Sequence, residues 1–325
     1  MVDSKNKWKA WLYLSPALVL LAVFTVWPIF NTVRLAFLQY YDETGAIKSY
    51  SLMAELGMIK EYGSASFHIG LESFKQVLGY KSFGLCLQNT VLLCVLTVPV
   101  STLLALLIAV ALNSIKFLNR FLQTIFFLPY VTNSIAIGMV FATMFNMVGT
   151  ALGLPGENIT SVGLFNNLLG VFGIDPIDWM SPSKDMYWAN MLVMIVYIVW
   201  NALPFKILVL LGGLQSVNKQ YYDAAKVDGT SKTRVFWRIT VPLLSPMISY
   251  LLITGFIGGF KEYSSVVGVF GEDMNNGQLQ TMVGYIYSAI GSNEGTASAA
   301  AIILFAMILV VTLINLKVSN KNTHY

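Results

Sequence analysis

The chain has 325 residues, of which 56% are hydrophobic and only 11% are charged, and its mean hydropathy is +0.66. Ordinary soluble domains carry roughly 25% charged residues, so this composition excludes a water-soluble globule of the usual kind. The net charge of +4 is spread along the chain, without the basic block that is typical of a nucleic-acid-binding protein. We therefore expect a protein that crosses a membrane several times and binds no nucleic acid.

Apolar runs of the length that a bilayer requires, roughly 20 residues, recur along the sequence. They lie at 11–38, 88–112, 121–145, 187–214, 243–270 and 297–316. Because they lack the alternating polarity of membrane β-strands, the sequence predicts an all-α integral membrane fold with six transmembrane helices. The first run follows three lysines, as a signal peptide would. It continues past Trp27 and Pro28, beyond the roughly 7–15 apolar residues of a cleavable segment, so we expect a retained helix.

Lysine and arginine are distributed unevenly between these runs. The amino terminus, the second and fourth loops and the tail hold twelve, whereas the first and third loops hold five. Cytoplasmic loops carry the excess, so both termini are expected in the cytoplasm. The resulting domain organisation is a helix with a long outer loop in 1–87, a five-helix core in 88–316 that contains a cytoplasmic loop at 216–242, and a tail in 317–325.

The loop between the fourth and fifth runs is the most informative stretch, and it reads YYDAAKVDGTSKTRVFWRITVP over 221–242. Its first part favours a short helix in which Ala224 and Ala225 lie on one side and leave room for a partner surface. Gly229 is placed to end that helix with a positive φ. Thr230 or Ser231 can then cap a second helix. A basic amphipathic helix can also lie on anionic membrane lipid, which is the simpler alternative for this loop.

The spacing within this loop resembles the signature of the permease subunits of binding-protein-dependent ABC importers, especially the carbohydrate-uptake group that includes maltose and multiple-sugar permeases. That signature is Glu-Ala-Ala, three residues, Gly, nine residues, Ile, one residue and Leu-Pro. The matching residues here are Asp223, Ala224, Ala225, Gly229, Ile239, Val241 and Pro242, with Asp for Glu and Val for Leu. The resemblance runs from about Gly70 to the tail. It includes GLESF at 70–74, Asn89-Thr90, Leu128-Pro129, Trp200, Pro204-Phe205, Gly295 and Ala297 to Ala301, whereas the family's Thr-Gly-Gly-Pro after the fifth span is absent.

The resemblance implies a type I ABC importer permease fold in the cell membrane, with no enzymatic activity and no cofactor of its own. It also implies three partners: a second homologous permease subunit, ABC-type ATPase subunits that take up the motif loop, and an extracytoplasmic solute-binding protein. The residues expected to couple to the ATPase are Asp223, Ala224, Ala225, Asp228, Gly229, Phe236, Ile239 and Pro242. The sequence contains no glycine followed by lysine and then serine or threonine, so no phosphate-binding loop is expected in this chain.

Ionisable side chains inside membrane spans cost roughly 2.5–3.5 kcal/mol each on insertion scales, so each needs an explanation. We expect Lys206 to extend to the cytoplasmic surface. Lys261 and Glu262 interrupt the fifth run, and we expect one or both to face a substrate pathway; an ion pair with a partner permease, or a nearer helix end, is the alternative. Aromatic and amide side chains suit sugars. The expected pathway residues are Tyr197, Trp200, Asn201, Phe260, Lys261, Glu262 and Tyr263.

The sequence thus favours a permease subunit for an oligosaccharide, and a permease for another polar solute such as glycerol phosphate is the nearest alternative. An ion-coupled secondary transporter would show inverted repeats and paired broken helices, which are not found here. A membrane enzyme or metal site is disfavoured, because the two histidines, His68 and His324, have no metal-ligand spacing. Cys86 and Cys94 would lie about 12 Å apart along one helix, too far for a disulfide.

Overall fold

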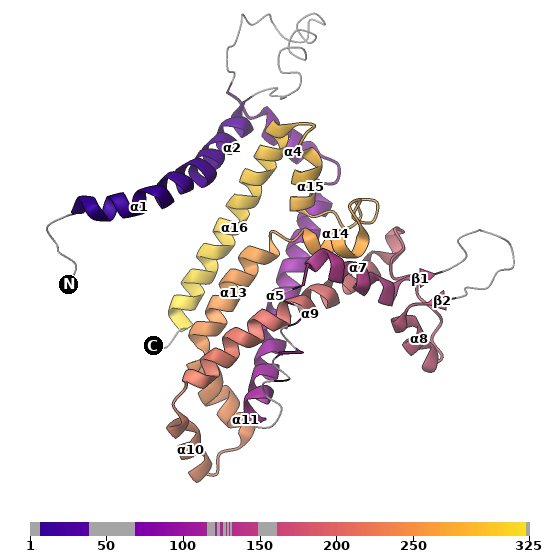
Figure 1. Ribbon diagram of the computed structural model, residues 1–325. Coiled ribbons are helices and arrows are strands. Elements are labelled where there is room, and N and C mark those ends of the chain that lie inside the picture. Colours follow the sequence, from indigo (N-terminus) through magenta and orange to yellow (C-terminus); the bar gives the residue numbers. More distant parts are fainter. Residues whose placement is uncertain are drawn as a thin grey trace, which may run out of the picture. The chain divides into compact units, whose positions relative to one another are not determined.

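The structure is a computed structural model that describes residues 7–38, 69–115, 132–148 and 161–322, together with isolated residues between 121 and 130. These residues are almost entirely helical, which confirms the expected all-α fold (Figure 1). One addition was not predicted: β1 (Met147–Val148) pairs antiparallel with β2 (Ser161–Val162) inside an expected outer loop. The chain forms two compact units, 1–83 with 285–305 and 84–284 with 306–325.

The first unit begins with a long apolar helix. The unit contains α1 (Lys7–Leu21), the π-helical turn η1 (Ala22–Val26), α2 (Trp27–Phe37), α4 (Glu72–Gly79), most of α15 (Met282–Ala289) and the start of α16 (Glu294–Asn322). The 18-residue apolar window within Trp11–Phe37 has no buried residue, which suits a helix surrounded by lipid and confirms the first expected span as helical. The end of α2 is held to α4, where the rings of Phe37 and Phe74 lie 5.2 Å apart.

The second unit is built around three helices, α5, α9 and α13 (Figure 1). Its elements are α5 (Phe83–Ser114), α7 (Ser134–Phe145), α8 (Leu164–Val171), η2 (Lys184–Met186), α9 (Tyr187–Ser216), α10 (Lys219–Val227), α11 (Lys232–Val235), η3 (Phe236–Thr240), α12 (Val241–Leu243), α13 (Ser245–Gly259) and α14 (Ser264–Phe270). Figure 1 shows α10 and α11 at one end of α9 and α13, and α8 at a distance from them.

The described residues contain four helices that are long and apolar enough to cross a membrane, or five if the bent pair 232–243 and 245–259 is one span. The expected fifth span, 243–270, is wrong as a single helix, because α13 ends at Gly259 and α14 begins only at Ser264. Of the expected third span, 121–145, the structure describes α7 and a few isolated residues, and the remainder lies outside the described residues. Six spans therefore stay a prediction.

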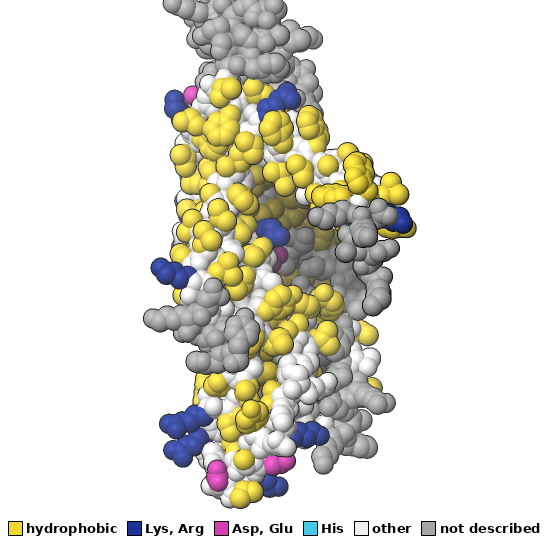
Figure 2. Space-filling model, turned by 90° about the vertical axis from the view of Figure 1, so that its left-hand side faces the viewer, with side chains coloured by type: hydrophobic (Ala, Val, Ile, Leu, Met, Phe, Trp, Pro, Cys, Tyr) yellow, Lys and Arg dark blue, Asp and Glu magenta, His cyan; other side chains and the backbone are white. Residues whose placement is uncertain are grey.

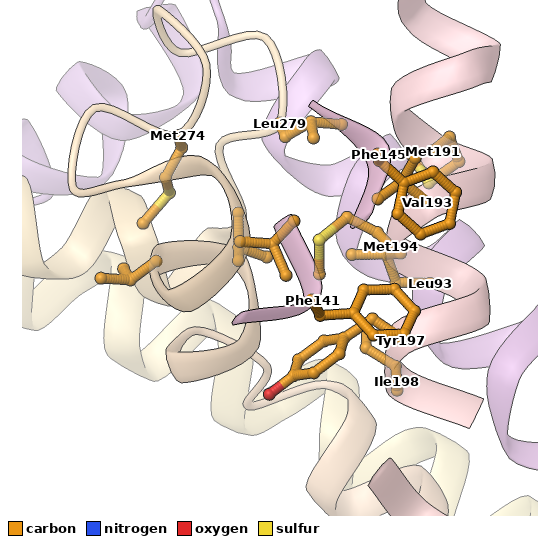
Figure 3. Packing of buried hydrophobic residues seen from close by; sticks show 13 residues of the cluster. Leu93, Phe141, Phe145, Met191, Val193, Met194, Tyr197, Ile198, Met274 and Leu279 are labelled. Carbon is orange, nitrogen blue, oxygen red and sulfur yellow. The ribbon is translucent and has the colours of Figure 1, made fainter. Parts of the chain in front are cut away.

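Two hydrophobic clusters hold the second unit together. In the first, residues of α5, α7, α9 and α14 meet, and the rings of Phe141 and Tyr197 lie 5.1 Å apart (Figure 3). α7 and α14 cross with their backbones in contact, since a methyl group on Gly138 would stand 2.8 Å from the backbone of Gly268. The second cluster joins α5, α9 and α13 near the end where α10 begins, and Phe236 and Val241 pack against it.

Candidate functional site

The 216–242 segment begins with α10, whose two ends are both closed by local hydrogen bonds. At its start, the side chain of Asn218 accepts a hydrogen bond from the backbone N–H of Gln220 at 3.0 Å. At its end, the Thr230 N–H donates to the Ala225 carbonyl and the Gly229 N–H donates to the Lys226 carbonyl. This pair of bonds needs a left-handed residue after the helix, and Gly229 supplies it with φ +65°. The predicted stop at Gly229 is confirmed.

A second helical stretch follows and leads directly into α13. Ser231 caps it, with its side-chain oxygen accepting from the Arg234 N–H at 3.4 Å, so of the two candidate caps the structure uses Ser231. α11 continues through the π-helical turn η3 into α12, which contains Pro242. The stretch 232–243 then meets α13 at a bend of 67°. The hydroxyl groups of Tyr222 and Thr240 lie 3.4 Å apart and connect α10 to this second stretch.

From the sequence, the two alanines of the motif were expected on one side of α10. That prediction is wrong. Ala225 is buried against its own chain, whereas Ala224 is exposed, so only Ala224 is free to meet a partner. Successive residues of a helix point about 100° apart, which is why neighbouring alanines separate. Large apolar side chains are exposed three residues before and after Ala224 on the same helix, namely Tyr221 and Val227. In Figure 1, α10 and α11 lie together at one end of α9 and α13. Figure 2 shows acidic and basic side chains close together at the bottom of the view.

The expected pathway residues Lys261, Glu262 and Tyr263 lie in the break between α13 and α14. Lys261 is exposed, and its side chain makes no hydrogen bond or ion pair with a described residue. Glu262 is half-buried, and its carboxylate accepts from the Ser265 N–H at 3.2 Å at the start of α14. The backbone carbonyl of Glu262 accepts from the hydroxyl of Thr281 at 2.9 Å. The end of α13 therefore lies next to Lys261 and Glu262, which is one of the alternatives that the sequence left open. The side chains of Lys261 and Glu262 do not form an ion pair with each other.

The expected pathway residues on α9 meet at the start of α7. The Tyr197 hydroxyl donates to the Ser134 carbonyl at 2.6 Å, and the Asn201 amide donates to the Ser134 hydroxyl at 3.4 Å. Tyr197 is fully buried, so its ring belongs to the hydrophobic core that Tyr263 also joins. Trp200 is partly exposed and stacks on Phe141 with a centroid distance of 6.1 Å.

These positions divide the predicted pathway residues into two groups. Asn201, Trp200, Lys261, Glu262 and Tyr263 keep exposed surface. Tyr197 and Phe260 are buried in the chain itself, so they position other residues rather than offering a surface to a solute.

Lys206 does not extend to the cytoplasmic surface, so that prediction is wrong. Its side chain is 6% exposed, and its ammonium group donates to three oxygens of α5: the Val98 carbonyl at 3.1 Å, the Ser101 hydroxyl at 2.6 Å and the Thr102 hydroxyl at 2.9 Å. No carboxylate of the described residues lies within ion-pair distance of this group. Three well-placed acceptors replace the water that a buried ammonium group loses.

Side-chain amides hold the loop at 271–281, which leads from α14 to α15. The Asn89 amide of α5 donates to the carbonyls of Gln278 and Gln280 at 3.0 and 2.9 Å, and its oxygen accepts from the Tyr187 hydroxyl at 2.8 Å. The Gln278 side chain donates to the Ser183 carbonyl and accepts from the Asn190 amide, each at 2.8 Å. Positive φ values at Met274, Asn275 and Asn276 show that this network holds a strained turn.

Several residues with these contacts were not recognised from the sequence as functional. They are Ser134, Asn190, Gln278, Thr281 and the Ser101–Thr102 pair. For Ser134, Asn190 and the Ser101–Thr102 pair, a polar side chain inside an apolar run was the only signal available, whereas Gln278 and Thr281 lie between two runs and gave none. The histidines are outside the described residues, and no three His, Cys, Asp or Glu side chains within the described part gather as a metal site.

Comparisons with known proteins place this geometry in context. A family model described as "Binding-protein-dependent transport system inner membrane component" matches residues 101–323. The arabinooligosaccharides transport system permease protein AraP of Bacillus subtilis is 34% identical over 263 residues, covering 80% of this chain and 78% of that protein. The sn-glycerol-3-phosphate transport system permease protein UgpA of Agrobacterium fabrum is 26% identical over 322 residues, covering 98% and 97%.

A solved structure shares the fold along nearly the whole chain. It is a bacterial ABC transporter involved in the import of the acidic polysaccharide alginate, and the match has a TM-score of 0.77 at 21% identity, covering 99% of this chain and 98% of that one. At this identity, the likeness concerns the fold alone. The match confirms the expected permease fold, while the class of the protein rests on the family model and the sequence relatives.

Proposed function

This chain belongs to the family of binding-protein-dependent transport system inner membrane components, and from that membership we propose that it forms half of the pathway of an ATP-driven importer for an oligosaccharide. The family consists of multi-pass membrane subunits of transporters and not of enzymes. ATP hydrolysis would take place in a separate subunit that contacts the 216–242 segment. A second permease would complete the pathway, and a solute-binding protein would deliver the solute.

The observation that carries the proposal is the construction of the 216–242 segment. Its inner face is fixed, because Ala225 is buried and Phe236 and Val241 pack on the cluster of α5, α9 and α13. Its outer face carries Ala224 beside the exposed side chains of Tyr221 and Val227. A rigid, exposed apolar surface bordered by charges is what a docking contact with another subunit requires. The segment connects α9 to α13, so movement of the segment would move both helices.

The exposed group of pathway residues supports a polar solute. Asn201 offers an amide, Trp200 a ring, and Glu262 a carboxylate, and such groups bind the hydroxyls and the C–H faces of a sugar. Greater identity to the arabinooligosaccharide permease than to the glycerol phosphate permease favours an oligosaccharide. A phosphate ester would favour more cations, and Lys261 is the one exposed cation among the described pathway residues.

Uptake by whole cells tests the solute. Cells that lack this chain and cells that regain it are compared for uptake of labelled arabinotriose, lactose and glycerol 3-phosphate. We expect uptake of an oligosaccharide to depend on the chain and uptake of glycerol 3-phosphate not to. Dependence of glycerol 3-phosphate uptake alone would replace the proposed solute class and leave the transport function standing.

A bulky substitution tests the docking surface. Ala224→Trp should prevent the ATPase subunit from co-purifying with the membrane complex, because the indole would fill the space next to Tyr221. Val171→Trp, on exposed α8 away from α10, is the matched control and should leave co-purification unchanged. Normal co-purification and uptake with Ala224→Trp would contradict the coupling role. Solute accumulation by vesicles that contain only this chain would contradict the whole proposal.

A further inference from the structure

We propose that Lys206 is a positioning residue for transport, which holds α9 against α5 and α13 in the state described here and must release them when the chain changes state. This inference rests on the proposed transport function, but its main test does not need ATP hydrolysis. It is supported by the hydrogen bonds of Lys206, by the prolines near it in α5 and α9, and by its position along α9.

The hydrogen bonds of Lys206 can run in one direction only. An ammonium group can only donate, so the Ser101 and Thr102 hydroxyls must accept from Lys206. Each hydroxyl can do so because its own proton goes to its own helix. The Ser101 hydroxyl donates to the Thr97 carbonyl at 2.5 Å, and the Thr102 hydroxyl donates to the Val98 carbonyl at 2.7 Å. All three acceptors belong to α5, and the single donor belongs to α9, so the contact fixes the register of one helix on the other.

At the level of Lys206, α5 and α9 are each locally weakened by a proline. α5 contains Pro99 and α9 contains Pro204, and a proline inside a helix removes one backbone hydrogen bond. α13 contributes Gly255, where a methyl group would come within 2.8 Å of Val98 and 3.7 Å of the Lys206 ammonium nitrogen. Two helices that contain a proline, and a third that packs closely at a glycine, therefore meet near one buried ammonium group. Apolar packing alone would not require a charge here.

Lys206 is also connected to the 216–242 segment along the chain. Lys206 lies ten residues before the end of α9, about 15 Å along the helix, and α10 begins three residues after that end. α13, the third helix of the contact, follows the same segment. A force applied at α10 or α12 therefore reaches the Lys206 contact through the end of α9 and through α13. Opening of the contact is the step that would let α9 slide on α5.

A natural reporter lies one helical turn away. Cys94 of α5 is fully buried, and a methyl group at Gly259 of α13 would stand 2.8 Å from its sulfur. Separation of α13 from α5 would expose this thiol. Cys86 is the internal reference, because it is equally buried, lies about 12 Å further along α5 and contacts Gln280 instead.

The experiment measures the rate at which N-ethylmaleimide modifies each thiol in vesicles that contain the complete transporter, read by mass spectrometry of the two peptides. We expect Lys206→Met to raise the rate at Cys94 about tenfold without changing the rate at Cys86, because loss of the contact raises the population of the opened state. Lys206→Arg keeps the donors and should restore most of the protection. Lys184→Met, which removes an exposed cation near the start of α9, should behave as wild type.

A second variant separates a positioning role from a general loss of structure. Ser101→Ala combined with Thr102→Val leaves the lysine in place and removes two of its acceptors, and it should also expose Cys94; it decides the question if Lys206→Met fails to insert. Both variants should lower the solute imported per ATP hydrolysed. Unchanged Cys94 rates, or equal increases at Cys94 and Cys86, would overturn the proposal. Loss of uptake in cells without the chain reports on the transport function separately.

Discussion

The 216–242 segment and the 271–281 loop are both turns between helices, yet different interactions hold them. Local hydrogen bonds close the first: Asn218 and Ser231 cap their own helices, and Gly229 ends α10. The second depends on Asn89 of α5 and Asn190 of α9, which lie about ninety or more residues away in sequence. The 216–242 segment is exposed and suits docking of a partner, whereas the 271–281 loop is strained and is held in place by side chains of other helices.

The largest effect should come from removing the long-range support of the 271–281 loop. Asn89→Leu takes the side-chain donor from the carbonyls of Gln278 and Gln280 and removes one hydrogen bond of the Tyr187 hydroxyl, at a cost of about 1–3 kcal/mol for each group that is left unsatisfied. We expect a marked drop in the thermal unfolding temperature in detergent and faster hydrogen exchange at 278–280. Tyr187→Phe removes one bond of the same network and should cost only about 0.5–1.5 kcal/mol. Equal effects of the two substitutions would show that Asn89 does not hold the loop.

A smaller effect is expected from the backbone of the 216–242 segment. Gly229→Val places a β-branched residue at φ +65°, which costs roughly 1–2 kcal/mol, and uptake should fall about tenfold while the amount of chain in the membrane stays the same. Gly229→Asn is the matched control, because asparagine tolerates this conformation. Both are measured by labelled-oligosaccharide uptake and by immunoblot of the membrane fraction. Equal uptake by the two variants would remove the conformational argument.

Loss of one cap should have a still smaller effect. Ser231→Ala removes the side-chain acceptor for the Arg234 N–H, and such caps contribute about 1 kcal/mol. Hydrogen exchange at 232–235 should quicken, while exchange at 219–227 stays unchanged. Ser231→Asp keeps the acceptor and should restore protection. Faster exchange throughout 219–243 would indicate that the two helical stretches of the segment unfold together.

The smallest change is expected from relieving strain in the 271–281 loop. Asn276 is exposed and has φ +55°, a conformation that glycine adopts readily. Asn276→Gly should therefore alter the unfolding temperature by no more than the equivalent of about 0.5 kcal/mol, and Asn276→Val should lower it by roughly 1–2 kcal/mol. Differential scanning calorimetry of the purified chain measures both. Destabilisation by glycine to the same extent as by valine would contradict the strain argument.

The sequence by itself determined what depends on composition and on neighbours in the chain. Long apolar runs require helices in a bilayer, because backbone groups there must bond within their own segment, and this explains why four predicted spans are long helices. Gly229 and Ser231 were predictable because a left-handed turn and a helix cap act over three or four residues. The spacing of the 223–242 motif indicated the family because that spacing is read directly along the chain.

Only the tertiary structure decided which polar groups meet across helices. Lys206 was expected at the cytoplasmic surface, and it instead binds Ser101 and Thr102, about a hundred residues away. The end of α13 at Gly259, the burial of Ala225 and the anchoring of Tyr197 at Ser134 were decided in the same way. An apolar run indicates that a helix is buried in lipid or protein, but it does not indicate which face of the helix meets which neighbour. The partners of its few polar side chains are therefore fixed by packing alone.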